Sequence, residues 1–169
     1  TFRKTGMSAM AAAFGDDVAV VDVGIDGDVP PVGILDRKVR RGTGNIVRED
    51  AMTRRQVLEA MAAGMEQAAL AKADGVTALG IGEMGIGNTT TSSAVLSVLL
   101  NVEPEKVTGR GGGVTDEGFR KKKAAIQKAI AVNQPNPEDV ADVLAKVGGF
   151  DIAAMCGAFL GCALTRRPV

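Results

Sequence analysis

The sequence predicts an α/β domain with three layers and a mostly parallel sheet. Two short apolar runs rich in β-branched residues, 18–23 and 76–81, are typical of buried strands. Helical patterns at 54–73, 92–100 and 116–132 alternate with these runs, which favours parallel strands joined by helical crossovers. The 169 residues are enough for one domain with a real core, and we expect a single domain over 1–169.

Composition excludes several classes of function. Twenty basic and twenty acidic residues cancel, so neither nucleic acid nor an anionic membrane is expected as a partner. Histidine is absent, so no histidine metal site, catalytic triad or histidine base is available, and we expect no metal and no cofactor. Cys156 and Cys162 lie six residues apart, on different faces of a helix, and are expected to be reduced. No signal peptide is recognisable, and the apolar run 152–164 is too short to span a bilayer, which predicts a cytoplasmic protein.

The N-terminal third leads to one edge of the predicted sheet. An alanine-rich helix over 7–14 closes at Gly15, and the strand 18–23 then runs into the turn 24–28. In parallel sheets the carboxyl edge is where ligands bind, so Asp26 and Asp28 could contact a ligand, although aspartates more often only form the turn. The stretch 28–50 is irregular. Its segment 36–41 carries one acid and four bases, which fits either a phosphate contact or a solvated connection.

Terminal signals place the remaining helices. We expect Thr53 to be the N-cap of the crossover helix, which Asp74-Gly75 ends. A short turn or helical piece follows at 102–107, and Thr115 is then the expected N-cap of the next helix. We expect Pro137 at the first position of the next helix, and Asp151 as the cap of 152–164. That last helix has almost no polar side and is expected to be buried nearly all round. Its Gly157 and Gly161 would allow close helix packing, in the core or between subunits.

The stretch 80–93 carries the strongest chemical signal. It reads Gly-Ile-Gly-Glu-Met-Gly-Ile-Gly-Asn-Thr-Thr-Thr-Ser-Ser, between a predicted strand and a predicted helix. Such a turn aims backbone N–H groups and the positive end of a helix dipole at an anion. Asn88 stands where the lysine of a nucleotide-triphosphate loop would be, which favours a single phosphate over ATP or GTP. Glu83 would repel phosphate, so we expect it near a ribose or the reacting carbon. The alternative is a turn whose glycines serve only packing.

A second glycine-rich segment, Gly109-Arg-Gly-Gly-Gly113, also permits close approach of a ligand to the backbone. The helix that follows it carries Arg120-Lys-Lys-Lys123 over a full turn, so at least one of these bases must face whatever the helix packs over. A solvated face is expected for the others.

The segment Glu83-Met-Gly-Ile-Gly-Asn-Thr-Thr90 resembles the signature of nicotinate-nucleotide–dimethylbenzimidazole phosphoribosyltransferases, which act in cobalamin lower-ligand assembly. Further segments follow in that family's order: Val21-Asp-Val-Gly24, Arg41-Gly-Thr-Gly-Asn45, Ala51-Met-Thr53, Gly109-Arg-Gly111 and Asp116-Glu-Gly118. The resemblance runs essentially from end to end. It corresponds to the middle portion of the family's longer chain, and Arg166-Arg-Pro-Val169 reads like the lead-in to a further strand.

The resemblance implies a Rossmann-like domain, apparently truncated at both ends, in a homodimeric enzyme. It implies transfer of the phosphoribosyl group of nicotinate mononucleotide to 5,6-dimethylbenzimidazole, giving α-ribazole 5′-phosphate and nicotinate. Glu83 would stabilise the ribose or its positive charge, with the general base outside this chain. The residues implied to bind the substrate phosphate are Gly85, Gly87, Asn88, Thr89, Thr90 and Lys122. A possible substrate loop comprises Gly109, Arg110 and Gly111, with Asp26.

Because the family's general base is a glutamate in a C-terminal segment that has no match here, we expect the chain alone to be inactive. Two other hypotheses stay open. One is a module that binds a nucleotide or phosphate without chemistry. The other is a structural role in which the glycines serve packing and the apolar C-terminal helix serves assembly.

Overall fold

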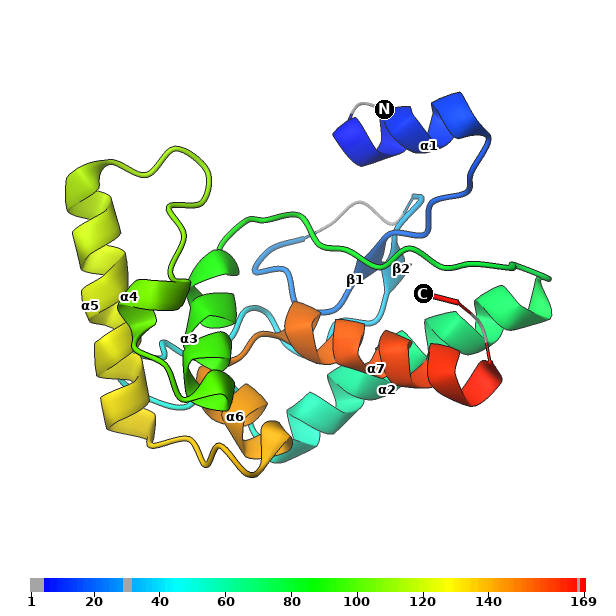
Figure 1. The fold of residues 1–169 in the computed structure, drawn as a ribbon. Helices are drawn as coiled ribbons and strands as arrows, with labels where there is room; N and C mark the ends of the chain where they lie inside the picture. Colours follow the sequence, from blue (N-terminus) through cyan, green and yellow to red (C-terminus); the bar gives the residue numbers. More distant parts are fainter. Residues whose placement is uncertain (1–4, 29–31, 167) are drawn as a thin grey trace.

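The structure is a computed structural model that describes residues 5–28, 32–166 and 168–169 (Figure 1). Residues 29–31 of the irregular stretch and Arg167 of the terminal one lie outside the described part. The elements in chain order are α1 (Gly6–Phe14), β1 (Val21–Asp22), β2 (Leu35–Asp36), α2 (Arg54–Ala73), α3 (Thr89–Leu100), α4 (Pro104–Val107), α5 (Asp116–Asn133), α6 (Val140–Val147) and α7 (Phe150–Thr165).

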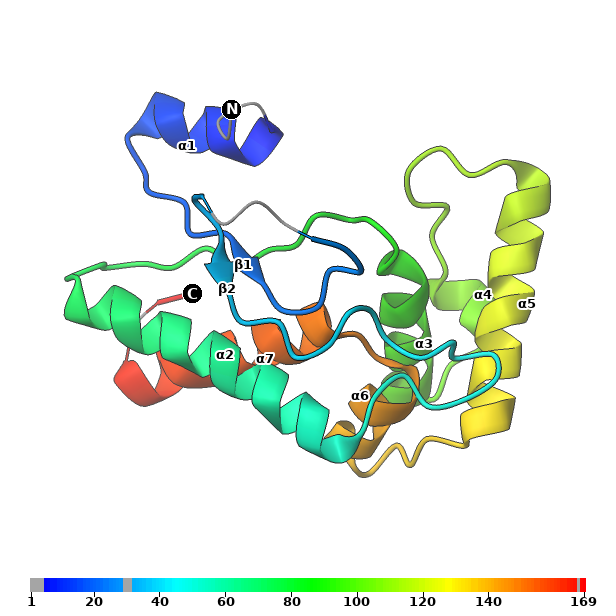
Figure 2. The same cartoon turned by 180° about the vertical axis from the view of Figure 1, so that it is seen from behind.

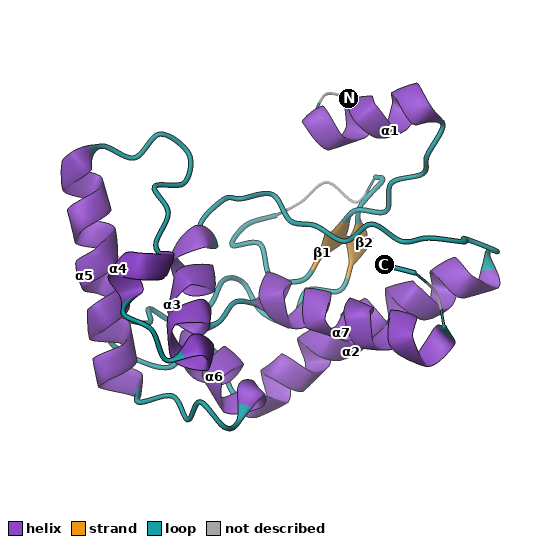
Figure 3. Cartoon of the chain, in the orientation of Figure 1, coloured by secondary structure: helices purple, strands orange, loops and turns teal. Residues whose placement is uncertain are grey.

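The α/β class and the parallel pairing of strands are confirmed, but the sheet is smaller than expected. β1 and β2 pair in parallel through Val21–Leu35 and Asp22–Asp36. In Figures 1 and 2 the strand pair lies between α1 on one side and α2 with α7 on the other. The loops that surround this short pair are extensive (Figure 3).

Both expected strands need correction. The first shrinks from 18–23 to two residues, and Val18 and Val20 are exposed. The second, 76–81, forms no strand and is largely exposed, although the Leu79 N–H donates to the Pro168 carbonyl at 3.1 Å. The missed strand β2 lies in the stretch expected to be irregular. A strand needs a regular ladder of hydrogen bonds with a neighbouring strand, and among the described residues such a ladder joins only Val21 and Asp22 to Leu35 and Asp36.

The helical predictions succeed where capping residues are distinct. Thr53 caps α2 in a full capping box with Gln56, Thr115 caps α5, and the short α4 lies within the expected piece. The predicted start of α6 was wrong: the helix begins at Val140, after the N-cap Asp139, and not at Pro137. The Asp139 carboxylate accepts two N–H groups, which fixes the start there.

The prediction for α7 was wrong in two respects. Its N-cap is Gly149, so Asp151 lies inside the first turn and does not cap the helix. The helix is also not buried all round, because Phe159, Leu160 and Leu164 are exposed. Within the described residues, no helix is both long and apolar enough to cross a bilayer.

Close packing of α2 on α7 depends on glycine. A Cβ added at Gly157 would lie 1.9 Å from the Met61 carbonyl oxygen, and one at Gly64 would lie 1.9 Å from that of Ala154. The expected close approach at Gly157 therefore occurs inside this chain. It holds α7 firmly along α2, which fixes where the start of α7 lies.

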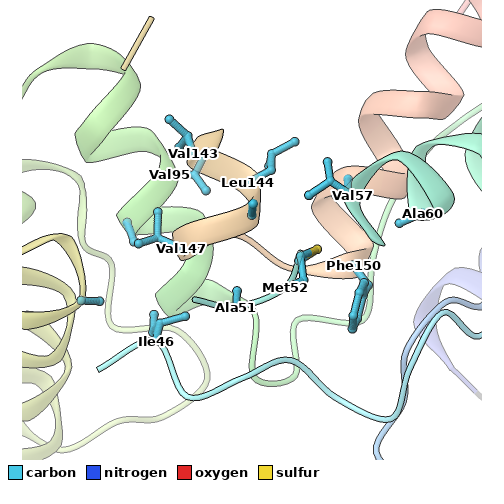
Figure 4. Close-up of a cluster of buried hydrophobic side chains, with 14 of the residues drawn as sticks. Ile46, Ala51, Met52, Val57, Ala60, Val95, Val143, Leu144, Val147 and Phe150 are labelled. Carbon is cyan, nitrogen blue, oxygen red and sulfur yellow. The ribbon is translucent and has the colours of Figure 1, made fainter. Parts of the chain in front are cut away.

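The main hydrophobic core brings the starts of α3 and α7 together (Figure 4). Val143, Leu144 and Val147 of α6 are buried at its centre, with Val95 of α3 and Phe150 of α7. Burying each such side chain stabilises the fold by roughly 1.5–3 kcal/mol. Residues of the core that Figure 4 labels are Ile46, Ala51, Met52, Val57, Ala60, Val95, Val143, Leu144, Val147 and Phe150.

Candidate functional site

The start of α3 is open to an anion. Its N-cap Asn88 has φ −98° and ψ −13° and makes no side-chain capping bond, whereas Thr53 and Thr115 cap α2 and α5. The first N–H groups of a helix have no intrahelical acceptor, and the helix dipole makes this end positive. The backbone N–H groups from Gly87 to Thr90 are therefore not capped by the Asn88 side chain and are available to an anion.

The glycines before α3 serve backbone conformation. Gly85 and Gly87 have φ of +73° and +80°, a region that favours glycine, and a Cβ added at either would meet nothing within 4 Å. The interpretation that these glycines only allow tight packing would require close neighbours, so the structure speaks against it for both residues.

An open cavity of about 680 Å³ lies at this helix start. Its lining joins parts of the two glycine-rich segments that the sequence singles out, 80–93 and 109–113, to α5. Lining residues that were expected to bind the substrate are Gly85, Gly87, Thr89, Thr90, Arg110 and Lys122.

Lys121 and Lys122 of the run 120–123 both line the cavity, and Lys122 is the base that contacts the start of α3. Its ammonium donates to Thr89 Oγ1 and to the Gly109 carbonyl, each at 2.9 Å. Both partners are neutral oxygens, and burial lowers the pKa of the Lys122 ammonium. By contrast Lys121 pairs with Glu117, and Lys123 lies over the Phe119 ring. Lys122 is therefore the positive charge in place to neutralise an anion at α3.

Gly111 packs against the contact between Lys122 and Thr89. It has φ +71°, and a Cβ added to it would lie 3.2 Å from Thr89 Oγ1 and 3.7 Å from Lys122 Nζ. Arg110 beside it donates to the Val114 carbonyl and the Asp116 carboxylate, which holds the loop closed. The structure thus brings the predicted substrate loop directly against the start of α3.

Glu83 and Asn88 form a second group beside the cavity. The Glu83 carboxylate accepts hydrogen bonds from the Gly85 N–H and from Asn88 Nδ2. Asn88 Nδ2 also donates to Asp151 Oδ2 at 2.6 Å. The side-chain amide of Asn88 is thereby committed to two carboxylates, which leaves its backbone N–H for an anion.

Asp26 stands apart from these residues. It is exposed on the turn after β1, where its Cβ would lie 3.4 Å from a Cβ added to Gly42. Neighbouring Asp28 pairs with Arg41, and Asp26 is not among the residues that line the cavity.

A buried clamp that the sequence did not suggest fixes this turn. Asp22 is 3% exposed, accepts the N–H groups of Gly24 and Ile25, and pairs with Lys38 Nζ at 2.9 Å. Burial raises the pKa of Asp22, but the hydrogen bonds from Ile25, Lys38 and Gly24 outweigh it and hold that pKa below its usual value. Lys38 belongs to the basic segment 36–41, so at least this base has a structural role.

Taken together, the fold and the site define an α/β domain with a cavity suited to an anion at a helix start. The sequence model of the phosphoribosyltransferase family matches residues 2–169, and the chain belongs to that family.

Among its relatives, the nicotinate-nucleotide–dimethylbenzimidazole phosphoribosyltransferase of Clostridium tetani is 48% identical over 165 residues, covering 98% of this chain and 46% of the relative. The enzyme of the same name from Geobacter metallireducens is 50% identical over 167 residues, covering 97% and 47%. The crystal structure of CobT from Thermus thermophilus superposes with a TM-score of 0.92 at 40% identity, covering 98% of this chain and 50% of that one. The chain thus spans about half the length of these relatives.

Proposed function

We propose that this chain serves the transfer of the phosphoribosyl group of nicotinate mononucleotide to 5,6-dimethylbenzimidazole, giving α-ribazole 5′-phosphate and nicotinate in cobalamin lower-ligand assembly. The observation that carries the proposal is one cavity that joins the open start of α3 to the Lys122 ammonium. The reaction is taken from the relatives' names. Their 48% and 50% sequence identity over 98% and 97% of this chain supports assigning the same reaction to it.

The phosphate of the mononucleotide binds at the start of α3. Backbone N–H groups from Gly87 to Thr90 and the hydroxyls of Thr89 and Thr90 donate to its oxygens, and Lys122 neutralises its charge. Asn88 contributes its backbone N–H, because its amide is occupied by carboxylates. Gly85 shapes the turn, since its own N–H donates to Glu83.

Glu83 then faces the ribose. As the benzimidazole nitrogen attacks the anomeric carbon and the bond to nicotinate breaks, positive charge develops on the ribose, and a fixed carboxylate stabilises it. The proton of the benzimidazole passes to a general base, which the family resemblance places outside this chain. Arg110 lines the cavity on the side opposite α3, while the Gly109 carbonyl accepts from Lys122 and Gly111 lies against Thr89. Asp26 lies outside the cavity lining, so the substrate contact expected of it from the turn after β1 stays a prediction.

The test is the release of nicotinate from its mononucleotide with dimethylbenzimidazole present. Two proteins are compared: the 169-residue chain, and a chimaera in which it replaces the matching 165 residues of the Clostridium tetani relative. We expect release by the chimaera and none by the chain alone. A correctly folded chimaera that binds the mononucleotide without releasing nicotinate would favour the alternative, a non-catalytic nucleotide-binding module.

The homodimer and the cytoplasmic location implied by the resemblance stay predictions. Light scattering of the chimaera measures the first, and a mass of one chain at micromolar concentration would contradict it. Fractionation of cells that express the natural gene measures the second.

A further inference from the structure

Asp151 links the start of α7 to the start of α3. Its Oδ2 accepts a hydrogen bond from Asn88 Nδ2 at 2.6 Å, across 63 residues of sequence. The backbone around it is fixed: Phe150 is 4% exposed in the core, and a Cβ added at Gly149 would lie 2.5 Å from Asp151 Oδ1 and 3.6 Å from Thr91 Oγ1. Asp151 is therefore a carboxylate held by a rigid element.

Glu83 has no comparable support of its own. It is exposed and lies in the glycine-rich segment before α3, where fixing one residue costs about 1–2 kcal/mol of conformational entropy. Its carboxylate bonds are to the Gly85 N–H, in the same segment, and to Asn88 Nδ2. The hydrogen bond from Asn88, the N-cap of α3, is thus what connects the Glu83 carboxylate to a helix.

The amide of Asn88 carries two N–H donors, and each has a carboxylate. One donates to Asp151 and the other to Glu83, which places the two carboxylates within about 5 Å of each other. Asn88 Oδ1 is buried and has no hydrogen-bond partner among the described residues. The amide orientation therefore depends on its two acceptors, of which Asp151 is the one on a rigid element.

We propose that Asp151 is a positioning residue of the transfer site: it holds the Asn88 amide, and through it the Glu83 carboxylate, where the ribose charge develops. This inference rests on the proposed function for its kinetic consequence. The competing explanation is that Asp151 only complements the dipole at the start of α7, as an acid in any first helical turn does.

Kinetics of the chimaera separate the two explanations. Asp151→Asn removes the charged acceptor, and we expect kcat for nicotinate release to fall about ten- to a hundred-fold, the value of one hydrogen bond to a charged group. The dissociation constant of nicotinate mononucleotide should change less than about threefold, because the phosphate contacts remain. Asp142→Asn is the matched control, an acid in the first turn of α6, and should leave both quantities unchanged.

A double-mutant cycle tests the path through Asn88. If Asp151 acts through that amide, Asn88→Ala with Asp151→Ala should lower kcat no further than Asn88→Ala alone. Additive losses, an unchanged kcat in Asp151→Asn, or an affinity loss equal to the kcat loss would each overturn the proposal.

A second readout does not need activity, so it stands even if the chimaera releases no nicotinate and the proposed function fails. In the 169-residue chain, Asp151→Ala should speed water exchange of the Asn88 side-chain amide protons by about tenfold, measured by NMR. Asp142→Asn should not. Equal exchange rates in the parent and Asp151→Ala would show that Asp151 does not hold this amide, and the inference would be withdrawn.

Discussion

Lys122→Ala should weaken binding of nicotinate mononucleotide far more than binding of nicotinate riboside, which has no phosphate. The ammonium lies 2.9 Å from Thr89 Oγ1, beside the first N–H groups of α3, and its present partners are neutral. A hydrogen bond to a charged group contributes roughly 1.5–3 kcal/mol, and about 1.4 kcal/mol is tenfold in affinity. We therefore expect a loss of about ten- to a hundred-fold for the mononucleotide.

Calorimetric titration of the chimaera gives both affinities. Lys128→Ala is the control, because it removes an exposed lysine of the same helix that does not line the cavity. Bound phosphate should also raise the lowered pKa of Lys122, so that binding takes up protons at alkaline pH. An equal loss for both ligands would show that Lys122 only supports the loop at Gly109, and the phosphate assignment would be wrong.

Three further changes test the site and its scaffold. Gly87→Val and Gly75→Val introduce similar backbone strain, at φ +80° and +78° with open space around both, and unfolding should show similar losses of stability. Mononucleotide affinity should fall only in Gly87→Val, and equal affinities would refute the approach of phosphate to that backbone. Gly157→Ala should destabilise the chain by about 1–3 kcal/mol through the clash with α2, and Gly80→Ala, in open space, should not, as thermal unfolding measures. Asp22→Asn should cost roughly 1.5–3 kcal/mol at pH 7. Because folding lowers the pKa of Asp22, its stabilisation is present above about pH 3.9 and fades as the pH falls further, so the gap in urea-unfolding free energy between the two proteins should close there.

Helices were predictable here because their signals are local. Thr53 and Thr115 each precede a helical run, and each accepts the N–H of the residue three further on. The strand at 76–81 was not predictable from its apolar character, because a strand exists only beside a partner and none pairs along it in the described chain. For the same reason β2 was missed, since its pairing with β1 depends on the fold.

The candidate site likewise has one part that local sequence predicted and another that depends on contacts between distant residues. The glycine, asparagine and threonine pattern before α3 predicted an anion-binding turn, and Lys122 came from family resemblance. The contact between Asn88 and Asp151 joins residues 63 apart, so no local pattern contains it. Asp151, two residues after a pair of glycines, resembles a helix cap, but Gly149 has extended backbone angles, φ −145° and ψ 156°, and is the N-cap, so the helix begins two residues earlier than predicted. Asp151 therefore lies in the first turn of α7, and its carboxylate accepts a hydrogen bond from Asn88 and does not cap the helix.

The most direct test of the central claim is a crystal structure of the chain, or of the chimaera, with nicotinate mononucleotide bound. We predict the phosphate at the start of α3, with its oxygens about 3 Å from the backbone N–H groups of Thr89 and Thr90 and from Lys122 Nζ. A phosphate bound elsewhere, for example at Arg40 and Arg41, with the start of α3 unoccupied, would contradict the account.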